Sequence, residues 1–565
     1  MAYMNQKWWQ SAVVYQIYPR SFQDTNDDGI GDIQGIIQRL DYIHSLGVNV
    51  IWLNPIFISP QIDNGYDISN YYRIDPIFGT MTDVEELIEK AHQLGIKIMF
   101  DFVLNHTSDQ HPWFQEALHD PDSLYRDYYL WADEKETGQL PNNWASFFGG
   151  SVWEKVPDRK EYYFHLFAKE MPDLNWKNPE VRIAMLNIAT FWLAKGVDAF
   201  RLDAFIHIAK EKNYPDVANV PEGELAIAEE FYSNLPEVHE YLSDFIKEVR
   251  RVKPDVFIVG EAASADVDLA VAYTDQTKDE CDAVISFRHF VEDESQKDPL
   301  LPAGMQKGPL DYHVFKNVMV EWQVKLASIG GPTLYWNNHD MARIASRFGD
   351  ERPEYRKNSS KMLATLMYLQ KGIPFILYGE ELGMLNLKMK DLAAYEDPGA
   401  VRFYEKATSI GYSDSAILEM LNSSSKDVSR GAMQWDASDY SGFSKVAPWS
   451  GVNQSKEDTV ATEEIEKNSV LNYYKKMIAL KKTSLFTTGV FQLQETSDEF
   501  YCYTRSIEDS TANIYCNLTD TPKQITCSKA EQAGDILLEN DGNYIQNQQI
   551  HLAPYGCLVI KLKGE

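Results

Sequence analysis

The sequence has few cysteines, few basic residues and no long apolar run. Its five cysteines form no CxxC pair, so we expect isolated reduced thiols and no disulfide framework. No run approaches the roughly 20 apolar residues of a membrane span. The first residues, MAYMNQKWWQSAVVYQIYP, have no apolar core behind a basic start. We therefore expect a cytoplasmic protein that contacts no membrane.

The shortage of basic residues excludes several kinds of partner. The chain carries 53 Lys and Arg against 84 Asp and Glu, a net charge of −31. A phosphate-binding surface would have to work against this field, so nucleic acid is not an expected partner. We find no Gly-rich phosphate loop, and no organic cofactor is predicted.

The 565 residues are 44% hydrophobic, enough for a large core and more than one domain. Short apolar runs alternate with amphipathic segments such as DIQGIIQRLDYIHSLG and TDVEELIEKAHQLG, which predict helices ending near Gly47 and Gly95. Eight buried strands alternating with helices are typical of an α/β protein with a (β/α)8 TIM barrel. The eight runs span residues 13–19, 48–53, 96–103, 197–204, 255–262, 283–288, 333–340 and 373–381.

The spacing of these runs predicts the domain organisation. The barrel begins in residues 1–104, and the aromatic segment 105–174 after the third strand is too long for a helix alone, so we expect an inserted domain B there. Residues 175–482 complete the barrel, with a long excursion after the eighth strand. Alternating segments then predict an antiparallel β-sandwich over 483–565, whose few aromatic residues we assign to its core.

Three of the apolar runs end in an acid: Asp203, Glu261 and Asp340. Catalytic residues of such barrels lie at the carboxyl ends of the strands. Each acid taken alone could be a helix cap or a salt-bridge partner, but three at equivalent positions favour a carboxylate-rich pocket. Such a pocket suits acetal cleavage, in which one carboxyl protonates the leaving oxygen and another attacks the anomeric carbon. Other polar residues expected on this face are Asp63, Tyr66, His106, Arg201 and His339.

The segments DNGYDIS, DFVLNH, AFRLDA, FIVGEA and NNHD, in this order along the chain, resemble the signature segments of the α-amylase superfamily of glycoside hydrolases. With KWWQSAVVYQIYPRSF and MQWD, nearly the whole chain is similar to the α-glucosidase and oligo-1,6-glucosidase branch. The resemblance implies that Asp203 is the nucleophile of a retaining enzyme, Glu261 the general acid and base, and Asp340 the stabiliser of the transition state. It implies a glucose site made by Asp63, Tyr66, His106, Arg201, His339 and Arg430.

Local chemistry adds to these roles. Arg201 shares a strand face with Asp203 and should keep it ionised, while Glu261 must hold a proton to act as an acid. Phe147 and Phe167 could form walls for the sugar, although ordinary packing explains them as well. The alternative for His106 and His339 is that they are structural histidines.

The branch resemblance implies release of glucose from the non-reducing end of short α-glucosides. Members that prefer α-1,6 bonds often carry Val after the nucleophile; here Ala204 predicts an α-1,4 preference, with oligo-1,6-glucosidase activity as the alternative. Transglucosylation is a further outcome. Rivals of another class are a non-catalytic transporter-associated relative and a carbohydrate-binding module, but the triad is intact. The predicted partner is a small oligosaccharide, and we expect a monomer or weak homodimer.

The stretch DTNDDGIGD follows the first strand and resembles a calcium loop. Asp24, Asn26 and Asp28, the carbonyl of Ile30, and Asp32 offer oxygens at the first, third, fifth, seventh and ninth positions, but Gly35 replaces the bidentate Glu. Related glucosidases bind calcium at a matching segment, so the resemblance implies a structural Ca²⁺. The alternative is a solvated acidic turn in which Asp32 caps the first helix.

Overall fold

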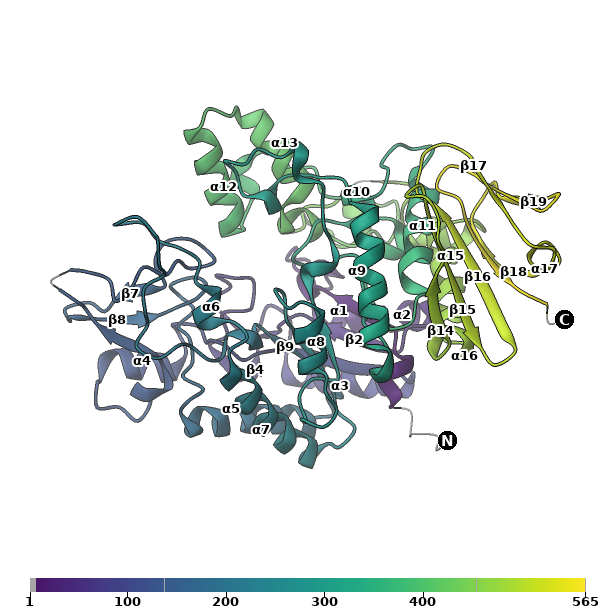
Figure 1. Ribbon diagram of the computed structural model, residues 1–565. Coiled ribbons are helices and arrows are strands. Elements are labelled where there is room, and N and C mark those ends of the chain that lie inside the picture. The colour runs from purple at the N-terminus through teal and green to yellow at the C-terminus, as the bar shows by residue number, and fades with distance from the viewer. Residues whose placement is uncertain (1–6, 137, 454, 564–565) are drawn as a thin grey trace. The chain divides into compact units, whose positions relative to one another are not determined.

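The computed structural model describes residues 7–136, 138–453 and 455–563 (Figure 1). The first six residues of the N-terminal segment discussed above lie outside this range. Contacts divide the chain into two compact units. Unit 1 comprises residues 1–51, 90–96 and 289–565, and unit 2 comprises residues 52–89 and 97–288. Within the described ranges, no helix is long and apolar enough to cross a membrane.

The eight predicted strands all form and make one sheet, in the order β11-β10-β9-β5-β2-β1-β13-β12. Apart from β11 and β12, which stand at the two ends of this order, strands that follow one another around a (β/α)8 barrel are neighbours in the sheet. The predicted fold class is therefore confirmed. Strand β2 contains the division between the two units. The strands are β1 (Val14–Ile17), β2 (Val50–Leu53), β5 (Lys97–Val103), β9 (Ala199–Asp203), β10 (Phe257–Glu261), β11 (Ala283–Ile285), β12 (Thr333–Leu334) and β13 (Ile373–Leu377).

Alternation along β5 separates the helix-facing residues from those that face the opposite side of the sheet. Phe100 packs against Trp192 of α5 (Pro179–Ala194) at 5.1 Å between ring centroids. Phe102 packs against Phe245 of α7 (Pro236–Val252) at 6.2 Å. Asp101, between them, therefore points away from the helices. The other longer helices are α3 (Met81–Gln93), α9 (Tyr312–Lys325), α11 (Arg356–Tyr368) and α15 (Val470–Lys481).

The helix predicted from DIQGIIQRLDYIHSLG is broken in two. Helix α1 covers Ile33–Gln38 and α2 covers Leu40–Leu46, with Arg39 at φ −101° and ψ 7° between them. The guanidinium of Arg39 donates to Gln23 Oε1 and lies 4.0 Å from the Trp435 ring centroid. Side-chain contacts distant in sequence therefore hold the residue where the helix breaks, and Gly47 ends α2 in the left-handed conformation as predicted.

Two segments inserted between barrel elements form structure of their own. The predicted domain B contains the antiparallel sheet β6-β8-β7, with strands Trp131–Asp133, Glu161–Phe164 and Trp153–Lys155. The excursion after β13 contains the helices α12 (Pro398–Ser409) and α13 (Asp414–Ser424), which sequence patterns did not predict. Ser413 caps α13 by accepting from the Ala416 amide, a helix-start signal present in the sequence.

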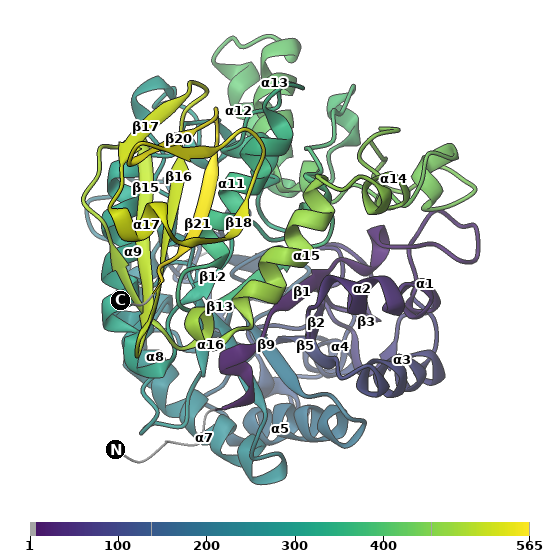
Figure 2. The same cartoon turned by 90° about the vertical axis from the view of Figure 1, so that its right-hand side faces the viewer.

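The C-terminal residues form the predicted antiparallel β domain, with a five-stranded sheet and a three-stranded sheet (Figure 2). The larger sheet has the order β14-β15-β16-β21-β18 and the smaller β17-β20-β19. Buried residues of both sheets, including Cys502, Tyr515 and Ile550, share one core cluster. The strands are β14 (Val490–Leu493), β15 (Phe500–Ile507), β16 (Ser510–Asn517), β17 (Lys523–Thr526), β18 (Asp535–Glu539), β19 (Tyr544–Gln546), β20 (Gln549–Leu552) and β21 (Cys557–Lys561).

One aromatic residue of this domain is not in the core. Tyr544 is 53% exposed, which corrects the expectation that the C-terminal aromatic residues are core residues. It begins β19, an edge strand only three residues long, and alternation places its neighbour Ile545 against the core instead. All five cysteines, in contrast, are buried free thiols.

Candidate active site

A single buried arginine contacts three carboxylates in unit 2. Arg201 Nη1 lies 2.7 Å from Asp101 Oδ1 and 2.5 Å from Asp203 Oδ1, and Nη2 lies 2.9 Å from Glu261 Oε2. The Arg201 side chain is 1% exposed. The predicted nucleophile and the predicted acid therefore bind two nitrogens of one planar group, which fixes both carboxyl groups close together.

The strand register explains why these residues meet. Asp101 on β5 is the parallel partner of Arg201 on β9, and Asp203 ends β9 two residues later on the same face. Glu261 ends the neighbouring strand β10, whose residue Gly260 pairs with Leu202. Parallel strands end at one edge of the sheet, so the acids predicted at strand ends are adjacent in space.

Charge balance in this cluster sets its protonation. Burial raises the pKa of Asp203, and the neighbouring carboxylates of Glu261 and Asp101 raise it further, while the Arg201 guanidinium opposes the rise. The expectation that Arg201 alone keeps the nucleophile ionised is thus only part of the balance. Three carboxylates face one cation, so the cluster has an excess of negative charge that favours retention of a proton.

Asp101 accepts hydrogen bonds from three donors. Its Oδ2 accepts from the Tyr66 hydroxyl at 2.8 Å and the Trp52 indole at 3.2 Å, and its side chain is fully buried. Burial raises the pKa of Asp101, and the three donors, counting Arg201, oppose this rise. The sequence analysis did not select Asp101. Its signal is an acid inside the apolar run IKIMFDFV, which requires a buried partner.

Tyr66, predicted to bind glucose, contacts both Asp101 and Arg201. Its hydroxyl accepts a hydrogen bond from Asn54 Nδ2 at 2.9 Å while donating to Asp101, and its ring centroid lies 5.9 Å from the Arg201 guanidinium carbon. Asp63, three residues earlier, donates its amide to Asp67 Oδ1 at 3.1 Å. Tyr66 therefore supports the cluster directly, and the loop that carries both residues is hydrogen-bonded internally.

His106 is buried and poised to donate or accept one further hydrogen bond. Burial lowers its pKa to about 4, against the opposing effect of the Asp173 and Asp63 carboxylates, so it is neutral at pH 7. Nδ1 lies 3.3 Å from Asn105 Nδ2, and the buried Nε2 has no hydrogen-bond partner among the described residues. A neutral imidazole with an open nitrogen suits a sugar hydroxyl.

An aromatic group lies next to His106. The ring centroid of Phe167 is 5.2 Å from that of His106 and 5.8 Å from that of Phe147, and Phe147 is 5.3 Å from His207. Both phenylalanines are only partly buried. The structure thus brings together the two predicted wall residues and the predicted glucose-binding histidine.

A lysine that the sequence patterns did not select fixes this region. Lys210 Nζ lies 2.6 Å from Asp173 Oδ2 and donates to Asn105 Oδ1 at 2.9 Å and to the His207 carbonyl at 2.6 Å. The side chains of Lys210 and Asp173 are 3% and 0% exposed. Asp173 also forms an isolated β-bridge with His106. Lys210 therefore links Asn105 and Asp173, two residues that contact His106.

Ala204, the predicted linkage residue, has an unusual backbone. Its φ is 47° and its ψ is 24°, in the left-handed region, and its amide lies 3.4 Å from Glu261 Oε2. A β-branched residue is strained in this conformation, whereas Ala tolerates it at lower cost. The residue is 6% exposed.

The remaining predicted catalytic residue and two predicted glucose-binding residues form a cluster within unit 1. Asp340 Oδ2 is 3.2 Å from His339 Nε2, and Asp340 Oδ1 is 3.3 Å from Arg430 Nη2. Arg430 also donates to the His339 carbonyl at 2.9 Å, and Gln16 Nε2 lies 2.9 Å from His339 Nδ1. The three predicted residues thus hold one another, and a functional role for the group stays a prediction.

The loop DTNDDGIGD, also in unit 1, is closed by its own side chains. Asp24 Oδ1 accepts from the amides of Asn26 and Asp27, and its Oδ2 accepts from the Gly29 amide and from Ser444. Asp32 accepts from Thr25 and from the Gly35 amide, as the predicted cap of α1. Across the described parts of the chain, no three His, Cys, Asp or Glu side chains are grouped to hold a metal ion.

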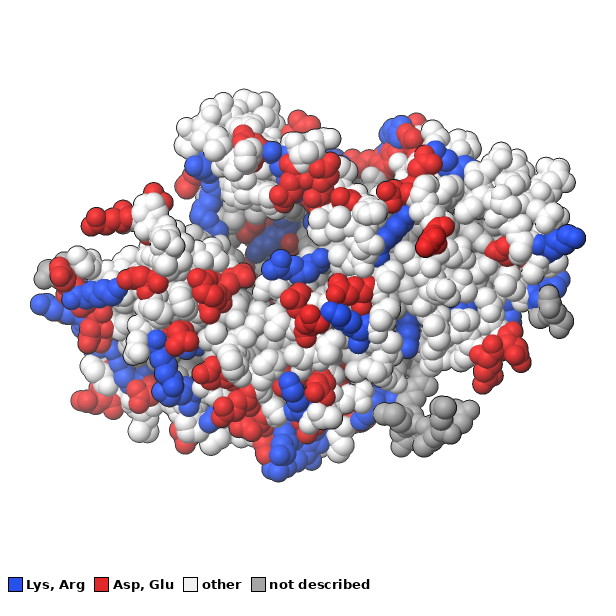
Figure 3. Space-filling view, in the orientation of Figure 1, with Lys and Arg blue, Asp and Glu red and all other residues white. Residues whose placement is uncertain are grey.

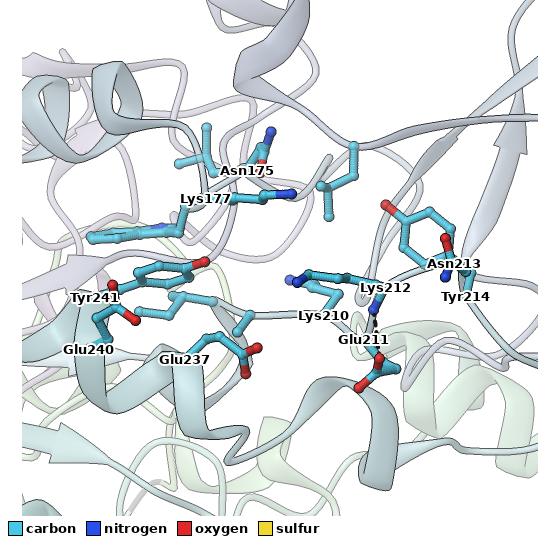
Figure 4. Close-up of a pocket in the computed structure, with 15 residues that line it drawn as sticks. Asn175, Lys177, Lys210, Glu211, Lys212, Asn213, Tyr214, Glu237, Glu240 and Tyr241 are labelled. Carbon is cyan, nitrogen blue, oxygen red and sulfur yellow. Dashed lines mark hydrogen bonds between the residues drawn. The ribbon is translucent and has the colours of Figure 1, made fainter.

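A cavity of about 640 Å³ lies within unit 2, and Lys210 is one of the residues that line it. Lys177 and Lys210 extend into the same region, near Glu237 and Tyr241 of α7 (Figure 4). None of the residues of the Arg201 cluster lines it. Its walls carry lysines and glutamates together.

The α-amylase family, described as "Alpha amylase, catalytic domain", matches residues 16–489. The chain belongs to the α-amylase family. An "Oligo-1,6-glucosidase" of Parageobacillus thermoglucosidasius is 42% identical, over 99% of this chain and 100% of the relative. An "Alpha-glucosidase" of Pediococcus pentosaceus is 41% identical over 98% and 99%. A solved structure named "Family GH13_31 enzyme" is 45% identical, with a TM-score of 0.89 over 99% of this chain and 100% of that one.

These similarities confirm that the chain belongs to the α-amylase family, as the sequence motifs predicted. Several further relatives are also named "Oligo-1,6-glucosidase", and one from Bacillus subtilis (strain 168) is named "Trehalose-6-phosphate hydrolase". The names support α-glucosidase chemistry on small sugars. They do not support the α-1,4 preference predicted from Ala204.

Proposed function

We propose that this chain is a retaining α-glucosidase that removes glucose from the non-reducing end of short α-1,6-linked oligosaccharides. The observation that carries the proposal is the pair of carboxyl groups, Asp203 and Glu261, bound to one buried guanidinium at the ends of neighbouring strands. Two carboxyl groups held close together are the requirement of a retaining glycosidase. The oligo-1,6-glucosidases among the relatives support the linkage.

In the first step, Asp203 attacks the anomeric carbon while Glu261 transfers its proton to the glycosidic oxygen. The bond between the anomeric carbon and that oxygen breaks, the shortened sugar leaves with the proton, and a β-glucosyl ester forms on Asp203. Arg201 holds both carboxyl groups in position during the step. Asp101 keeps Arg201 in place through its own contact of 2.7 Å.

In the second step, Glu261 accepts a proton from water, and the resulting oxygen nucleophile attacks the anomeric carbon. The ester bond to Asp203 breaks and glucose leaves with its α configuration retained. A sugar hydroxyl that replaces water gives transglucosylation by the same route. We expect Asp340 to stabilise the positive charge that develops on the ring in both steps.

We further propose that one terminal glucose is held by Asp63, Tyr66, His106, His339 and Arg430, with Phe147 and Phe167 beside it. The open Nε2 of His106, in a neutral ring, supports a hydrogen bond to a sugar hydroxyl. A site that holds the end of a chain favours short substrates over the interior of a polymer. The enzyme then needs no partner besides its sugar, and we expect a monomer or weak homodimer, which sedimentation velocity would establish.

Ala204 is the observation that favours a second candidate, an α-1,4-specific glucosidase. A small side chain after the nucleophile leaves space that a valine would fill, and such a difference changes discrimination by only ~1 to 3 kcal/mol. The deciding experiment compares kcat/KM for isomaltose and maltose in the wild type and in Ala204→Val. Preference for isomaltose supports the main proposal; preference for maltose that Ala204→Val reverses supports the second.

The comparison needs a control because of the backbone at Ala204. Valine is strained at a φ of 47°, so Ala204→Val could lower activity on every substrate. Ala204→Gly relieves the strain and removes only a methyl group. A ratio of the two substrates that changes with Val and stays with Gly reflects side-chain volume. An unchanged ratio in both variants means that Ala204 does not set the linkage.

The mechanism is tested by separating the two steps. Asp203→Ala should abolish turnover of p-nitrophenyl α-glucoside, because no ester can form. Glu261→Gln should hydrolyse substrates with a poor leaving group most slowly, and azide, which needs no base, should restore turnover of the activated glucoside with a glucosyl azide as product. Activity that survives Asp203→Ala, or azide without effect on Glu261→Gln, would contradict the assignment.

We also propose a structural Ca²⁺ in the loop of Asp24, Asn26, Asp28, Ile30 and Asp32. The oxygens are those that calcium prefers, and Asp28 and Asn26 are exposed. Asp24 and Asp32 already accept hydrogen bonds from the amides of Gly29 and Gly35. Their carboxylates would therefore bind the ion through the lone pairs that these hydrogen bonds do not use. Chelation followed by calcium addition should lower and then restore the Tm; an unchanged Tm, with no calcium in the purified protein by mass spectrometry, would contradict the site.

A further inference from the structure

The outer face of the small C-terminal sheet carries a pair of stacked rings, an exposed tyrosine and a half-buried histidine. Tyr544 of β19 and His551 of β20 are direct cross-strand partners, and their rings are stacked with centroids 4.2 Å apart at an angle of 11°. One face of the tyrosine ring therefore rests on the imidazole. Tyr544 is nevertheless 53% exposed, because β19 is an edge strand of the sheet β17-β20-β19.

The residues around this pair are amides and hydroxyls. The register places Gln524 beside His551, in the same row as Tyr544. The parallel row, two residues away, contains Thr526, Gln549 and Gln546. Gln549 Nε2 donates to Thr526 Oγ1 at 3.1 Å. Alternation turns Ile525, Ile545 and Ile550 to the opposite side, where they join the core.

The face has almost no fixed charge, although the protein as a whole carries −31. In Figure 3 the surface at the upper right, where Figure 1 labels β17 and β19, is mostly white, whereas groups of acidic and basic residues are scattered over the rest of that view. The two rows contain no Asp, Glu, Lys or Arg. A neutral polar face neither attracts a charged ligand nor repels a neutral one.

We propose that this face is a second carbohydrate-binding site, which holds a neutral α-linked glucan chain on the C-terminal domain. An aromatic ring with one exposed side offers an apolar platform to the C–H face of a pyranose. The neighbouring glutamine and threonine side chains provide donors and acceptors for its hydroxyls. The combination of apolar platform and uncharged hydrogen-bonding groups matches a sugar better than a peptide or a nucleic acid, both of which carry charge or need a larger apolar core.

The site would add a function to the proposed hydrolysis of short chains. A glucan chain bound on the C-terminal domain keeps the enzyme near the polymer from which short substrates are released, and so raises their local concentration. This binding does not require that the linkage proposed above be correct. A protein that hydrolyses isomaltose, or one that hydrolyses maltose, would bind the chain equally through this face.

The rival occupant is a second copy of the chain. The edge strand β19 has backbone groups that could extend a sheet with another molecule. This alternative predicts that Tyr544 controls self-association and has no effect on glucan binding. The two occupants are therefore separated by measuring both properties in the same variants.

The test is native electrophoresis of the full-length chain through gels that contain glycogen, dextran or no polysaccharide. All variants carry Asp203→Ala, so that the polymer is not hydrolysed. We expect glycogen or dextran to retard the Asp203→Ala parent, and Tyr544→Ala to weaken the binding by about tenfold, as for truncation of a central aromatic anchor. Tyr544→Phe keeps the ring and should bind as the parent does.

Tyr72 provides a matched control, since it is 39% exposed and lies in unit 2. Tyr72→Ala should leave the retardation unchanged. With Asp203 restored, Tyr544→Ala should hydrolyse p-nitrophenyl α-glucoside at the parent rate, which shows that it folds. Equal retardation of Tyr544→Ala and the parent would overturn the proposal, as would the absence of retardation in every gel. A dimer that Tyr544→Ala dissociates, without retardation by either polymer, would assign the face to self-association instead.

Discussion

Replacing Lys210 by methionine is expected to destabilise unit 2 far more than loss of an ordinary ion pair. Lys210 and Asp173 are 2.6 Å apart, and their side chains are 3% and 0% exposed. Methionine keeps the apolar stem but leaves the Asp173 carboxylate buried without its cation. Removing one partner of such a pair costs about 3 to 5 kcal/mol of unfolding free energy.

An exposed pair in the same unit supplies the control. Lys135 and Asp216 are 2.8 Å apart, but their side chains are 49% and 53% exposed. Water and salt screen this pair, so Lys135→Met should cost at most about 1 kcal/mol. The distances within the two pairs are nearly equal, so the variants differ in burial and in the two further hydrogen bonds that Lys210 donates.

The assay is urea-induced unfolding followed by tryptophan fluorescence, with Lys210→Met, Asp173→Asn and the double variant measured together. Because Asp173→Asn removes the uncompensated charge, the double variant should lose less stability than the sum of the single variants. The KM for p-nitrophenyl α-glucoside should also rise in Lys210→Met, since Asn105 loses its 2.9 Å contact next to His106. If Lys210→Met cost no more than Lys135→Met, the reasoning would be refuted.

Three further perturbations test the site and the core. Burial raises the pKa of Glu463 from 4.5 to about 8. The contribution of the protonated side chain to folding stability is therefore full below pH 4.5 and is lost as the pH rises through 8. Glu463→Gln can still accept from the Leu471 amide, and it should reduce the loss of unfolding free energy between pH 5 and pH 9, measured with urea, by roughly 4 kcal/mol. His106, with a pKa of about 4, should not titrate in the kcat/KM profile above pH 5, and His106→Ala should lower kcat/KM by about tenfold or more without shifting the acidic limb. Tyr66→Phe removes a donor to Asp101 and should lower kcat/KM, with a rise of about 1 to 3 kcal/mol in the activation free energy. An unchanged kcat/KM would show that this hydrogen bond is not needed.

Much of the barrel could be predicted from the sequence because its signal is local. A buried strand must be a short apolar run, and an acid that ends such a run must lie at the edge where parallel strands end, as Asp203 and Glu261 do. Their shared contact with Arg201 is different in kind, because it depends on the register of β9 with β10. No pattern within one strand contains that register.

The residues that sequence patterns did not select depend on contacts between distant segments. Asp101 and Arg201 are 100 residues apart in the chain, and the distance from Lys210 to its partner Asn105 is 105 residues. Neither contact can be inferred from its own segment. Tyr544 was assigned to the core for a similar reason: three residues of β19 are too few to show an alternating pattern, and only the pairing with β20 reveals which side faces solvent.

The guanidinium of Arg201 also bears on the timing of the reaction. Before bond cleavage, its charge is divided among three carboxyl groups. In the mechanism proposed above, Asp203 becomes a glucosyl ester, its oxygen loses the negative charge, and the cation is shared by Asp101 and Glu261 alone. The field at Glu261 then favours its ionised form, which is the form that must take a proton from water. The proposed mechanism therefore links the change of Glu261 from acid to base to formation of the ester, through the charge of Arg201.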